Sequence, residues 1–301
     1  MAQILDGKAT AKRVRGELKR EIKRLAVIAE CQPQAVFIQV GENPASTTYV
    51  NMKHKMAERI GCLSTIVRLA ETITQDELLE CIQRYNTDRT VHGILVQLPL
   101  PDHIDENVIV QAISPQKDVD CFHPENVGRM MIGLPGPKPA TPLGIVTLLD
   151  AYGIDVTGMN VTVVGRSNLV GKPLGIMLLL RHGTVTYCHT RTRDLAAECK
   201  RADLLIAAAG RAGIVTPEMI KPGAVVVDVG TNFIPAVDEH GQPVLDEDGK
   251  QKSKLVGDVD FAAAEKFAAW ISPVPGGVGP MTIASVLSNT VTLYKLIEGV
   301  E

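Results

Sequence analysis

The sequence predicts an α/β protein of two lobes, each built on a parallel sheet. Short apolar runs rich in β-branched residues alternate with stretches whose apolar residues repeat at helical spacing. A Pro- and Gly-rich stretch, IGLPGPKPATP at 132–142, separates two such series and is typical of a connection. The second series opens with a β-branched run and a glycine-rich turn, which predicts a Rossmann-like lobe.

In the first lobe, helical stretches alternate regularly with strand-like runs. This alternation favours a parallel sheet with helical crossovers. The expected elements are a helix at 8–27, a strand at 35–41, a helix around 49–53, a strand at 64–69, a helix at 75–87 and a strand at 93–101.

The second lobe shows the same alternation, followed by two segments of different character. Its expected elements are strands at 160–165, 184–188, 203–210 and 224–230, with helices at 172–181 and 194–200. The polar, turn-rich stretch 238–254 predicts an exposed loop or hairpin without catalytic content. A constrained loop at 272–282 leads into a closing helix at 282–297.

Length and composition exclude several classes of protein. The 301 residues suffice for one large or two ordinary domains, and a net charge of −3 gives no reason to expect nucleic acid or an anionic membrane as a partner. No apolar run is long enough to span a membrane, and the start of the chain lacks the apolar core of a signal peptide.

The seven histidines form no HxxxH pair, so no metal site is expected. The six cysteines lack CxxC or disulfide-scaffold spacing and predict reduced thiols of a cytoplasmic protein.

A lysine lies on the apolar face of the helix predicted within residues 45–61. At about 100° per residue, Met52, Met56 and Ile60 share one face, and Tyr49 and Lys53 fall within the same arc. An amine that points inward loses hydration, which lowers its pKa toward the range where it exchanges protons near neutrality. The alternative is that this lysine extends past the edge of the core to water, or pairs with a carboxylate.

The glycine turn after the 160–165 run is a candidate phosphate site. Gly165, Arg166 and Ser167 stand between the strand and a helix that carries a proline in its first turn. Backbone amides and the positive end of the helix dipole suit a phosphate at such a turn. The next glycine is Gly171, so the spacing is not G-x-G-x-x-G, and a turn that serves packing alone is the alternative.

Charge in the next loop indicates which dinucleotide this turn would bind. A protein that binds NAD usually has an acid at the end of the second strand, but here none occurs before Asp194. Arg166 and Thr190, with Arg191, could instead bind a 2′-phosphate through charge-assisted hydrogen bonds. NADP is therefore favoured over NAD. An ordinary solvated loop is the alternative for Arg191 and Arg193.

Several motifs in order along the chain resemble one enzyme family. The motifs are Tyr49-Val50-x-x-Lys53, VQLPLP (96–101), KDVD (117–120), Gly165-Arg166-Ser167 and PGGVGPMT (275–282). Together they resemble those of the bifunctional methylenetetrahydrofolate dehydrogenase/methenyltetrahydrofolate cyclohydrolases. The resemblance covers essentially the whole chain, from ILDGKA (4–9) to the last helix.

The resemblance implies two reactions at one site. The enzyme would oxidise 5,10-methylenetetrahydrofolate with NADP and then hydrolyse the methenyl product to 10-formyltetrahydrofolate. The family's catalytic lysine corresponds to Lys53, its stacking tyrosine to Tyr49, its glutamine to Gln97 and its pterin-binding aspartate to Asp120. For Gln97 the alternative is a cap on a strand end, and for Asp120 a cap on the following turn.

Further site residues follow from the same motifs. The substrate-binding set is expected to include Val96, Leu98, Pro275, Gly276 and Gly277 besides the four residues above, and the cofactor-binding set adds Thr231 to Gly165, Arg166, Ser167, Thr190 and Arg191. The glycines of PGGVGP let the backbone approach a flat ligand, although a simple rigid loop is the alternative.

The family also implies an organisation into lobes. The folate-side lobe is expected at 1–140, completed by 275–301 through the returning C-terminal helix, and the NADP lobe at 141–274. The active site is expected in a cleft, with Lys53 and the nicotinamide on opposite walls. A homodimer through the nucleotide lobe is implied as well.

Two positions depart from the family pattern. Cys121 stands where the family usually has glycine, and it would be strained there if the backbone requires a positive φ. The run Thr231-Asn232-Phe233 replaces an aliphatic residue followed by Asn and a basic residue.

Other functions remain open at the level of sequence. One is a dehydrogenase with little cyclohydrolase activity or with a preference for NAD, and another is a non-catalytic nucleotide sensor on the same scaffold. An amino-acid dehydrogenase would share the glycine turn and a catalytic lysine but would not explain PGGVGPMT or VQLPLP.

Overall fold

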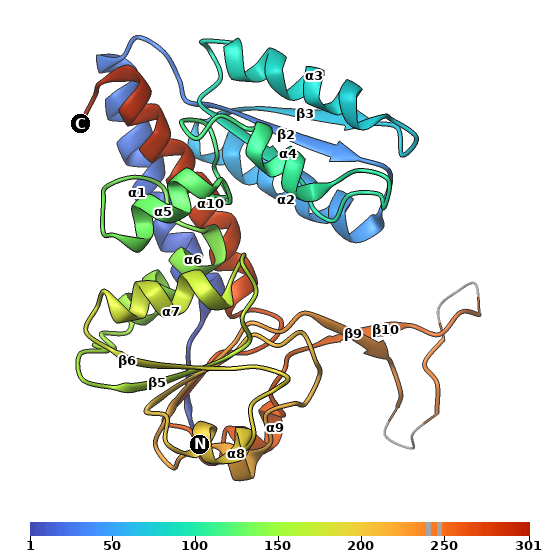
Figure 1. Cartoon of the computed structure of the whole chain (residues 1–301), viewed down its shortest axis with the longest axis vertical. Helices are drawn as coiled ribbons and strands as arrows, with labels where there is room; N and C mark the ends of the chain where they lie inside the picture. The colour runs from blue at the N-terminus through green and yellow to red at the C-terminus, as the bar shows by residue number, and fades with distance from the viewer. Residues whose placement is uncertain (239–241, 246–248) are drawn as a thin grey trace. The chain divides into compact units, whose positions relative to one another are not determined.

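The computed structural model describes residues 1–238, 242–245 and 249–301 (Figure 1). They form two compact units: unit 1 comprises Met1–Thr10 and Ile145–Met281, and unit 2 comprises Ala11–Gly144 and Thr282–Glu301. Within the described residues no helix is long and apolar enough to cross a membrane.

Unit 2 is built on a three-stranded parallel sheet in the order β3-β2-β4. Two apolar clusters, one around Phe37 and one around Ile38, fill the two faces of β2, because successive side chains of a strand point to opposite faces. The elements are α1 (Gly7–Ile28), β2 (Gln34–Val40), α2 (Pro44–Ile60), β3 (Leu63–Leu69), α3 (Gln75–Thr87), β4 (Gly93–Val96), α4 (Glu106–Ala112), α5 (Pro124–Met131), α6 (Ala140–Ala151) and α10 (Val278–Glu298), of which α1, α6 and α10 also have residues in unit 1.

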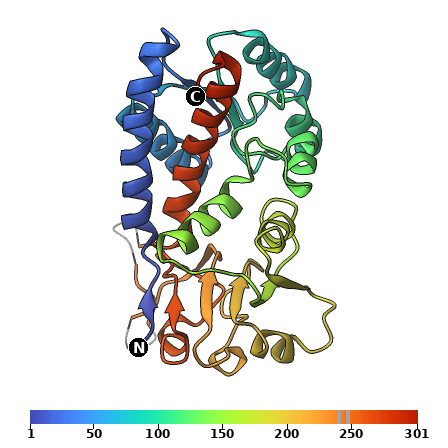
Figure 2. The ribbon, with the colours of Figure 1, turned by 90° about the vertical axis from the view of Figure 1, so that its left-hand side faces the viewer.

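The C-terminal helix α10 packs against α1 within unit 2. The two helices lie side by side in Figure 2, and an ion pair of 3.0 Å joins Lys295 Nζ to Glu21 Oε1. Tyr294 is fully buried, and its hydroxyl donates to the carbonyl of Cys31 at 2.8 Å. The expected return of the last helix to the N-terminal part of the chain is confirmed.

Unit 1 holds a six-stranded sheet in the order β1-β11-β8-β7-β5-β6, with parallel pairing throughout. β5 has β6 on one side and β7 on the other, so the strand order reverses at β5, as in doubly wound folds, while the N-terminal strand β1 lies at the opposite edge of the sheet. The elements are β1 (Gln3–Ile4), β5 (Asn160–Val164), α7 (Gly171–Leu179), β6 (Thr184–Cys188), α8 (Leu195–Lys200), β7 (Leu204–Ala207), η1 (Pro217–Met219), β8 (Val225–Asp228), β9 (Asn232–Pro235), β10 (Ser253–Val256), α9 (Phe261–Ala264) and β11 (Trp270–Ile271).

Several elements differ from the sequence prediction. The strand expected at 93–101 ends at Val96, because the following VQLPLP run carries two prolines that cannot donate to a ladder. The closing helix begins at Val278, four residues earlier than expected, with Pro280 in its first turn, where a missing N–H costs nothing. Helices α4, α5 and α6 were not predicted, and α6 lies partly within the Pro- and Gly-rich stretch.

The buried face of α2 was also predicted only in part. Met52 is 38% exposed, so its assignment to the inward face was wrong, whereas Ile60 and Lys53 are buried. The buried stripe runs through Ser46, Val50, Lys53, Ala57 and Ile60. These positions are three and four residues apart, which keeps the lysine in the middle of the packed face.

The polar insertion 238–254 is flanked by an antiparallel pair, β9 and β10, which extends away from the sheet of unit 1 (Figure 1). This pairing confirms a hairpin. Residues 239–241 and 246–248, which belong to the same prediction, lie outside the described residues.

Candidate active site

Lys53 lies on the packed face of α2 with only 6% of its surface exposed. The helix begins where the side chain of Asn43 accepts hydrogen bonds from the amides of Ala45 and Ser46, and Gly61 ends it in a left-handed conformation. The alternative that Lys53 extends to water is wrong, because an exposed ammonium group requires more surface than this.

Gln97 is the hydrogen-bond partner of the buried amine. It follows β4 directly, and its backbone amide donates to the carbonyl of Ile38 at 2.8 Å, which extends the pairing with β2. Its side-chain Nε2 donates to the carbonyl of Leu98 at 2.7 Å. This contact fixes the orientation of the amide, so that Oε1 points to Lys53 Nζ and accepts its hydrogen bond at 3.1 Å.

The KDVD segment brings Asp120 to the same edge of the sheet. Ile94 on β4 forms a parallel bridge with Asp118, so 117–120 runs beside β4 like a further strand. Asp118 is 2% exposed and accepts hydrogen bonds from the amides of Cys121 and His123 and from Asn126 Nδ2. The turn is therefore capped by Asp118, and the alternative that gave this role to Asp120 is wrong.

The Asp120 carboxylate, by contrast, has no hydrogen-bond donor among the described residues. Burial raises the pKa of Asp120, and the nearby Lys53 opposes this rise. Burial likewise lowers the pKa of Lys53, and the charge of Asp120 opposes that change. Both pKa shifts favour the uncharged forms of the two side chains, between which one proton can be shared. The cause is the low polarity of the surroundings, which disfavours a pair of opposite charges.

The other predicted folate-side residues of unit 2 differ in exposure. Tyr49 is half-buried and lies one helical turn before Lys53 on α2. Val96 is 6% exposed and belongs to the core cluster, so little of its side chain is accessible to a ligand. Leu98 is half-buried and packs against the same cluster.

Cys121 adopts a left-handed backbone, with φ at 59°. It is fully buried, and its thiol donates to the carbonyl of Pro137 at 3.3 Å. Burial raises the pKa of this thiol, so it stays protonated. The backbone therefore has the positive φ that would strain a cysteine at this position. The hydrogen bond from the Cys121 amide to Asp118 holds the turn in this conformation.

The left-handed backbone at Cys121 leads to a prediction about the free energy of unfolding. Cys121→Gly relieves about 1–2 kcal/mol of backbone strain and loses a similar amount of buried side chain, so the free energy of unfolding should change by less than about 1 kcal/mol. Cys121→Val should lower it by about 2 kcal/mol or more, because β-branched residues strongly disfavour this region. Urea unfolding measures both. Equal stability of the Gly and Val variants would contradict a constraint from φ.

The loop 275–277 lies in unit 1. Gly276 has φ at 117°, and its carbonyl accepts the amide of Lys8 at 3.1 Å. Gly7 packs so closely that a side-chain carbon there would lie 1.7 Å from the carbonyl oxygen of Gly277. Pro275 is exposed. Close packing onto the start of α1 is therefore one reason for these glycines, independent of any ligand.

The glycine turn after β5 has the features of a phosphate site. Gly165 has φ at 129°, and a side-chain carbon there would lie 2.0 Å from the carbonyl oxygen of Ala208. Ser167 Oγ accepts the amides of Val170 and Gly171 at the start of α7. The amides of Arg166 and Ser167 have no acceptor among the described residues, so they remain available to an anion. The residues present fit a dinucleotide phosphate.

The remaining predicted cofactor residues follow neighbouring strands at the same edge. Val164 pairs with both Cys188 and Ala207, and Ala207 pairs with Asp228, so the carboxyl ends of β5, β6, β7 and β8 lie together. Arg166, Thr190, Arg191 and Thr231 are exposed residues of the loops that leave these ends. In doubly wound sheets this edge binds the ligand.

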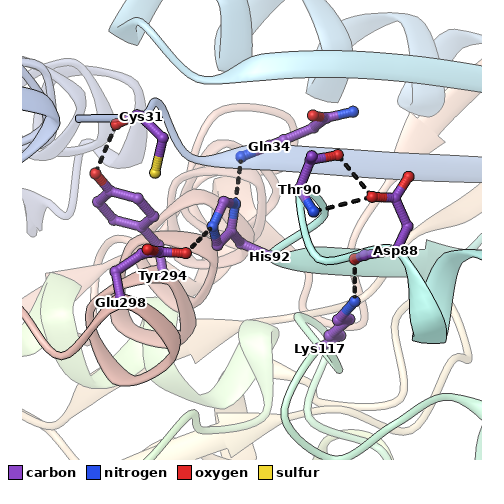
Figure 3. A network of polar contacts seen from close by, with 8 residues as sticks. All are labelled: Cys31, Gln34, Asp88, Thr90, His92, Lys117, Tyr294 and Glu298. Carbon is purple, nitrogen blue, oxygen red and sulfur yellow. Dashed lines mark hydrogen bonds and ion pairs between the residues drawn. The ribbon is translucent and has the colours of Figure 1, made fainter. Parts of the chain in front are cut away.

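Unit 2 also contains a polar cluster that includes Cys31, His92 and Glu298 (Figure 3). The potential ligand atoms of Cys31, His92 and Glu298 lie within 4.8 Å of one another. The amide of Gln34 donates to His92 Nδ1 at 3.1 Å, so the ring proton is on Nε2, which lies 3.0 Å from Glu298 Oε1. A metal at Nε2 would force the proton onto Nδ1, against the Gln34 N–H. The geometry therefore favours a hydrogen-bonded junction over a metal site.

Sequence reasoning missed one carboxylate near the predicted cofactor loops. Asp258 is fully buried, and its partners come from three segments that are distant in sequence. The one available signal was the Gly-Asp pair at 257–258, directly after a polar insertion.

Residues 5–120 match the family "Tetrahydrofolate dehydrogenase/cyclohydrolase, catalytic domain", and residues 139–298 match its "NAD(P)-binding domain". The "Bifunctional protein FolD" of Moorella thermoacetica is 52% identical over 290 residues, which are 96% of this chain and 98% of that protein.

Solved structures give the same result. The bifunctional FolD dehydrogenase/cyclohydrolase of Campylobacter jejuni is 46% identical, covers 98% of this chain and 99% of its own, and superimposes with a TM-score of 0.90. The Trypanosoma brucei methylenetetrahydrofolate dehydrogenase-cyclohydrolase, solved with NADP and an inhibitor, is 38% identical with a TM-score of 0.90, and the match covers 98% of each chain.

Proposed function

Because the chain belongs to the tetrahydrofolate dehydrogenase/cyclohydrolase family, we propose that Lys53, Gln97 and Asp120 form the centre of its two reactions. The chain is a bifunctional enzyme that oxidises 5,10-methylenetetrahydrofolate with NADP and hydrolyses the methenyl product to 10-formyltetrahydrofolate. The relatives' bifunctionality favours this function over a monofunctional dehydrogenase or a nucleotide sensor. The observation that carries the proposal is the buried amine of Lys53, 3.1 Å from Gln97 Oε1.

In the oxidation, a C–H bond of the methylene bridge breaks and its electron pair leaves as hydride. Positive charge then spreads over the carbon and its two nitrogens. NADP, when bound, supplies the acceptor of the hydride. A protonated Lys53 beside this carbon would oppose the charge, whereas the neutral amine that burial favours would not.

In the hydrolysis, a water molecule adds to the methenyl carbon. The neutral amine of Lys53 accepts a proton from this water as the C–O bond forms. The proton passes to nitrogen 5 as its bond to the carbon breaks, and the hydroxyl proton is released as the formyl group forms on nitrogen 10. Gln97 holds the amine in one orientation without adding charge.

The folate itself is proposed to bind through Asp120 and its neighbours. The Asp120 carboxylate, which lacks a donor among the described residues, can accept two hydrogen bonds from the amino-pyrimidine edge of the pterin. Tyr49 offers a flat face to the rings. Leu98 adds apolar contact and Val96 acts through its backbone, since its side chain is buried. Pro275, Gly276 and Gly277 complete the proposed set.

NADP is proposed to bind unit 1 along the carboxyl edge of its sheet. The free amides of Arg166 and Ser167, at a turn where Gly165 permits close approach, support a phosphate there. Arg166, Thr190 and Arg191 would hold the 2′-phosphate through charge-assisted hydrogen bonds. Thr231 would contact the nicotinamide ribose.

The direct test supplies the protein with methylenetetrahydrofolate and NADP and follows reduced cofactor and the methenyl chromophore together. Both activities in one site predict that reduced cofactor accumulates while the chromophore rises little and then decays to the formyl product. A chromophore that accumulates in step with reduced cofactor would contradict the cyclohydrolase assignment.

We also propose a cytoplasmic homodimer that associates through unit 1, with neither nucleic acid nor a membrane as partner. The exposed apolar side chains of Phe233 and Ile234 on β9 support a protein contact, because they leave apolar surface on both faces of the hairpin exposed to water. Six free cysteines suit a reducing compartment.

A further inference from the structure

Asp258 is a fully buried carboxylate in unit 1 that gathers four hydrogen-bond donors. Its Oδ2 accepts the amides of Ala209 and Gly210 at 2.6 and 2.9 Å. Its Oδ1 accepts the amide of Arg211 at 2.9 Å and Asn232 Nδ2 at 2.8 Å. Four donors match the capacity of an ionised carboxylate, and no neutral side chain of similar size could accept them all.

These donors belong to two loops that leave adjacent strands. Residues 208–211 follow β7, and residues 229–232 follow β8, with Ala207 paired to Asp228 at the strand ends. Both loops lie on the opposite side of β5 from β6, whose loop carries Thr190 and Arg191. The strand order of the sheet reverses at β5. A dinucleotide that binds across the edge of the sheet at this point would place its nicotinamide half at the two loops that Asp258 joins.

A second carboxylate holds Asp258 itself in place. Asp228 Oδ1 accepts the amides of Gly230 and Asp258, and Oδ2 accepts the amide of Val259, each at 2.9 Å. A side-chain carbon on Gly257 would lie 1.8 Å from Asp228 Oδ2, so the two carboxylate turns interlock without spare space. Burial raises the pKa of Asp228 to about 6.

Such an arrangement costs desolvation that apolar packing would avoid. What it provides instead is a fixed backbone for two loops that contain glycine and expose Arg211 and Thr231 at their surface. Fixed loops bind a ligand more tightly because less conformational entropy is lost on binding.

We propose that Asp258 is a positioning residue that sets the affinity of unit 1 for the nicotinamide half of NADP without touching it. The proposal rests on the binding of NADP at this edge. Because NAD has the same nicotinamide half, Asp258 should affect both dinucleotides equally. Arg166, proposed to bind the 2′-phosphate, should instead discriminate between them.

The test measures dissociation constants of NADPH and NADH by fluorescence titration. Asp258→Asn places an N–H₂ group against amide donors, and we expect both constants to rise by the same factor, about tenfold or more. Asn232→Ala removes one donor only and should produce a smaller rise in the same direction. Asp260→Asn, two residues on and exposed, is the matched control and should bind as the wild type does.

Cyclohydrolase turnover without dinucleotide supplies the second measurement, since its proposed central residues Lys53, Gln97 and Asp120 lie in unit 2. It should stay within about twofold of wild type in Asp258→Asn and in Asn232→Ala. Unchanged dissociation constants, a change in the NADPH-to-NADH ratio, or an equal loss of cyclohydrolase turnover would each overturn the proposal. A wild-type protein that binds neither dinucleotide would instead overturn NADP binding at this edge.

Discussion

Lys53→Met is expected to reduce hydrolysis of methenyltetrahydrofolate by about 100-fold or more, because a positioned proton carrier contributes at least this factor. Methionine has nearly the same length as lysine, and the site is already buried, so the fold should tolerate the change. Stopped mixing of the methenyl compound with the variant, followed at the chromophore, measures the rate.

The matched control for this prediction is Lys55→Met. Lys55 lies on the same helix but is exposed, so the same substitution tests the replacement of a lysine by methionine on α2 without touching the buried amine. We expect wild-type hydrolysis from the control and wild-type NADP binding from both variants. Near-normal hydrolysis by Lys53→Met would remove Lys53 from the mechanism.

Arg166→Ala is expected to raise the Michaelis constant for NADP by about tenfold while that for NAD changes little. A hydrogen bond between charged groups contributes about 1.5–3 kcal/mol, and the exposure of Arg166 places the effect at the lower end. Steady-state kinetics of the dehydrogenase with each dinucleotide give both constants.

Arg193→Ala is the control for charge alone, because Arg193 is an exposed arginine of the loop after β6 that has no proposed contact. It should leave the ratio of the two constants unchanged. Equal increases for NADP and NAD in Arg166→Ala would show that Arg166 does not read the 2′-phosphate.

Much of the fold could be predicted because its signals are local. The strands β2, β3, β5 and β6 and the helices α1, α3 and α7 lie within a few residues of their expected positions, since apolar periodicity is read over a short window. The short helices α4 and α5 escaped prediction because seven or eight residues give too few repeats of that period. Met52 was misplaced because the arc of a helix that packs against a sheet depends on its partner.

The candidate site was predictable in its residue types and unpredictable in its contacts. The motif and the inward position identified Lys53, and the structure adds that its amine donates a hydrogen bond to Gln97 Oε1. Which aspartate of KDVD caps the turn was not decidable, because Asp118 and Asp120 both point away from their intervening valine. The bridge of Asp118 with Ile94 and the donors around it decide the matter.

The sequence by itself determined the family, the two α/β units, the cofactor class and the presence of a lysine on an apolar face. Only the tertiary structure decided how far that lysine is dehydrated, that the Asp120 carboxylate has no hydrogen-bond donor within the described residues, and that Asp258 joins two loops. The physical reason is the range of the interactions. Helical and strand periods arise within one element. By contrast, Gln97 lies 44 residues from Lys53, and Asn232 and Ala209 lie 26 and 49 residues from Asp258, so these partners meet only when the sheets form.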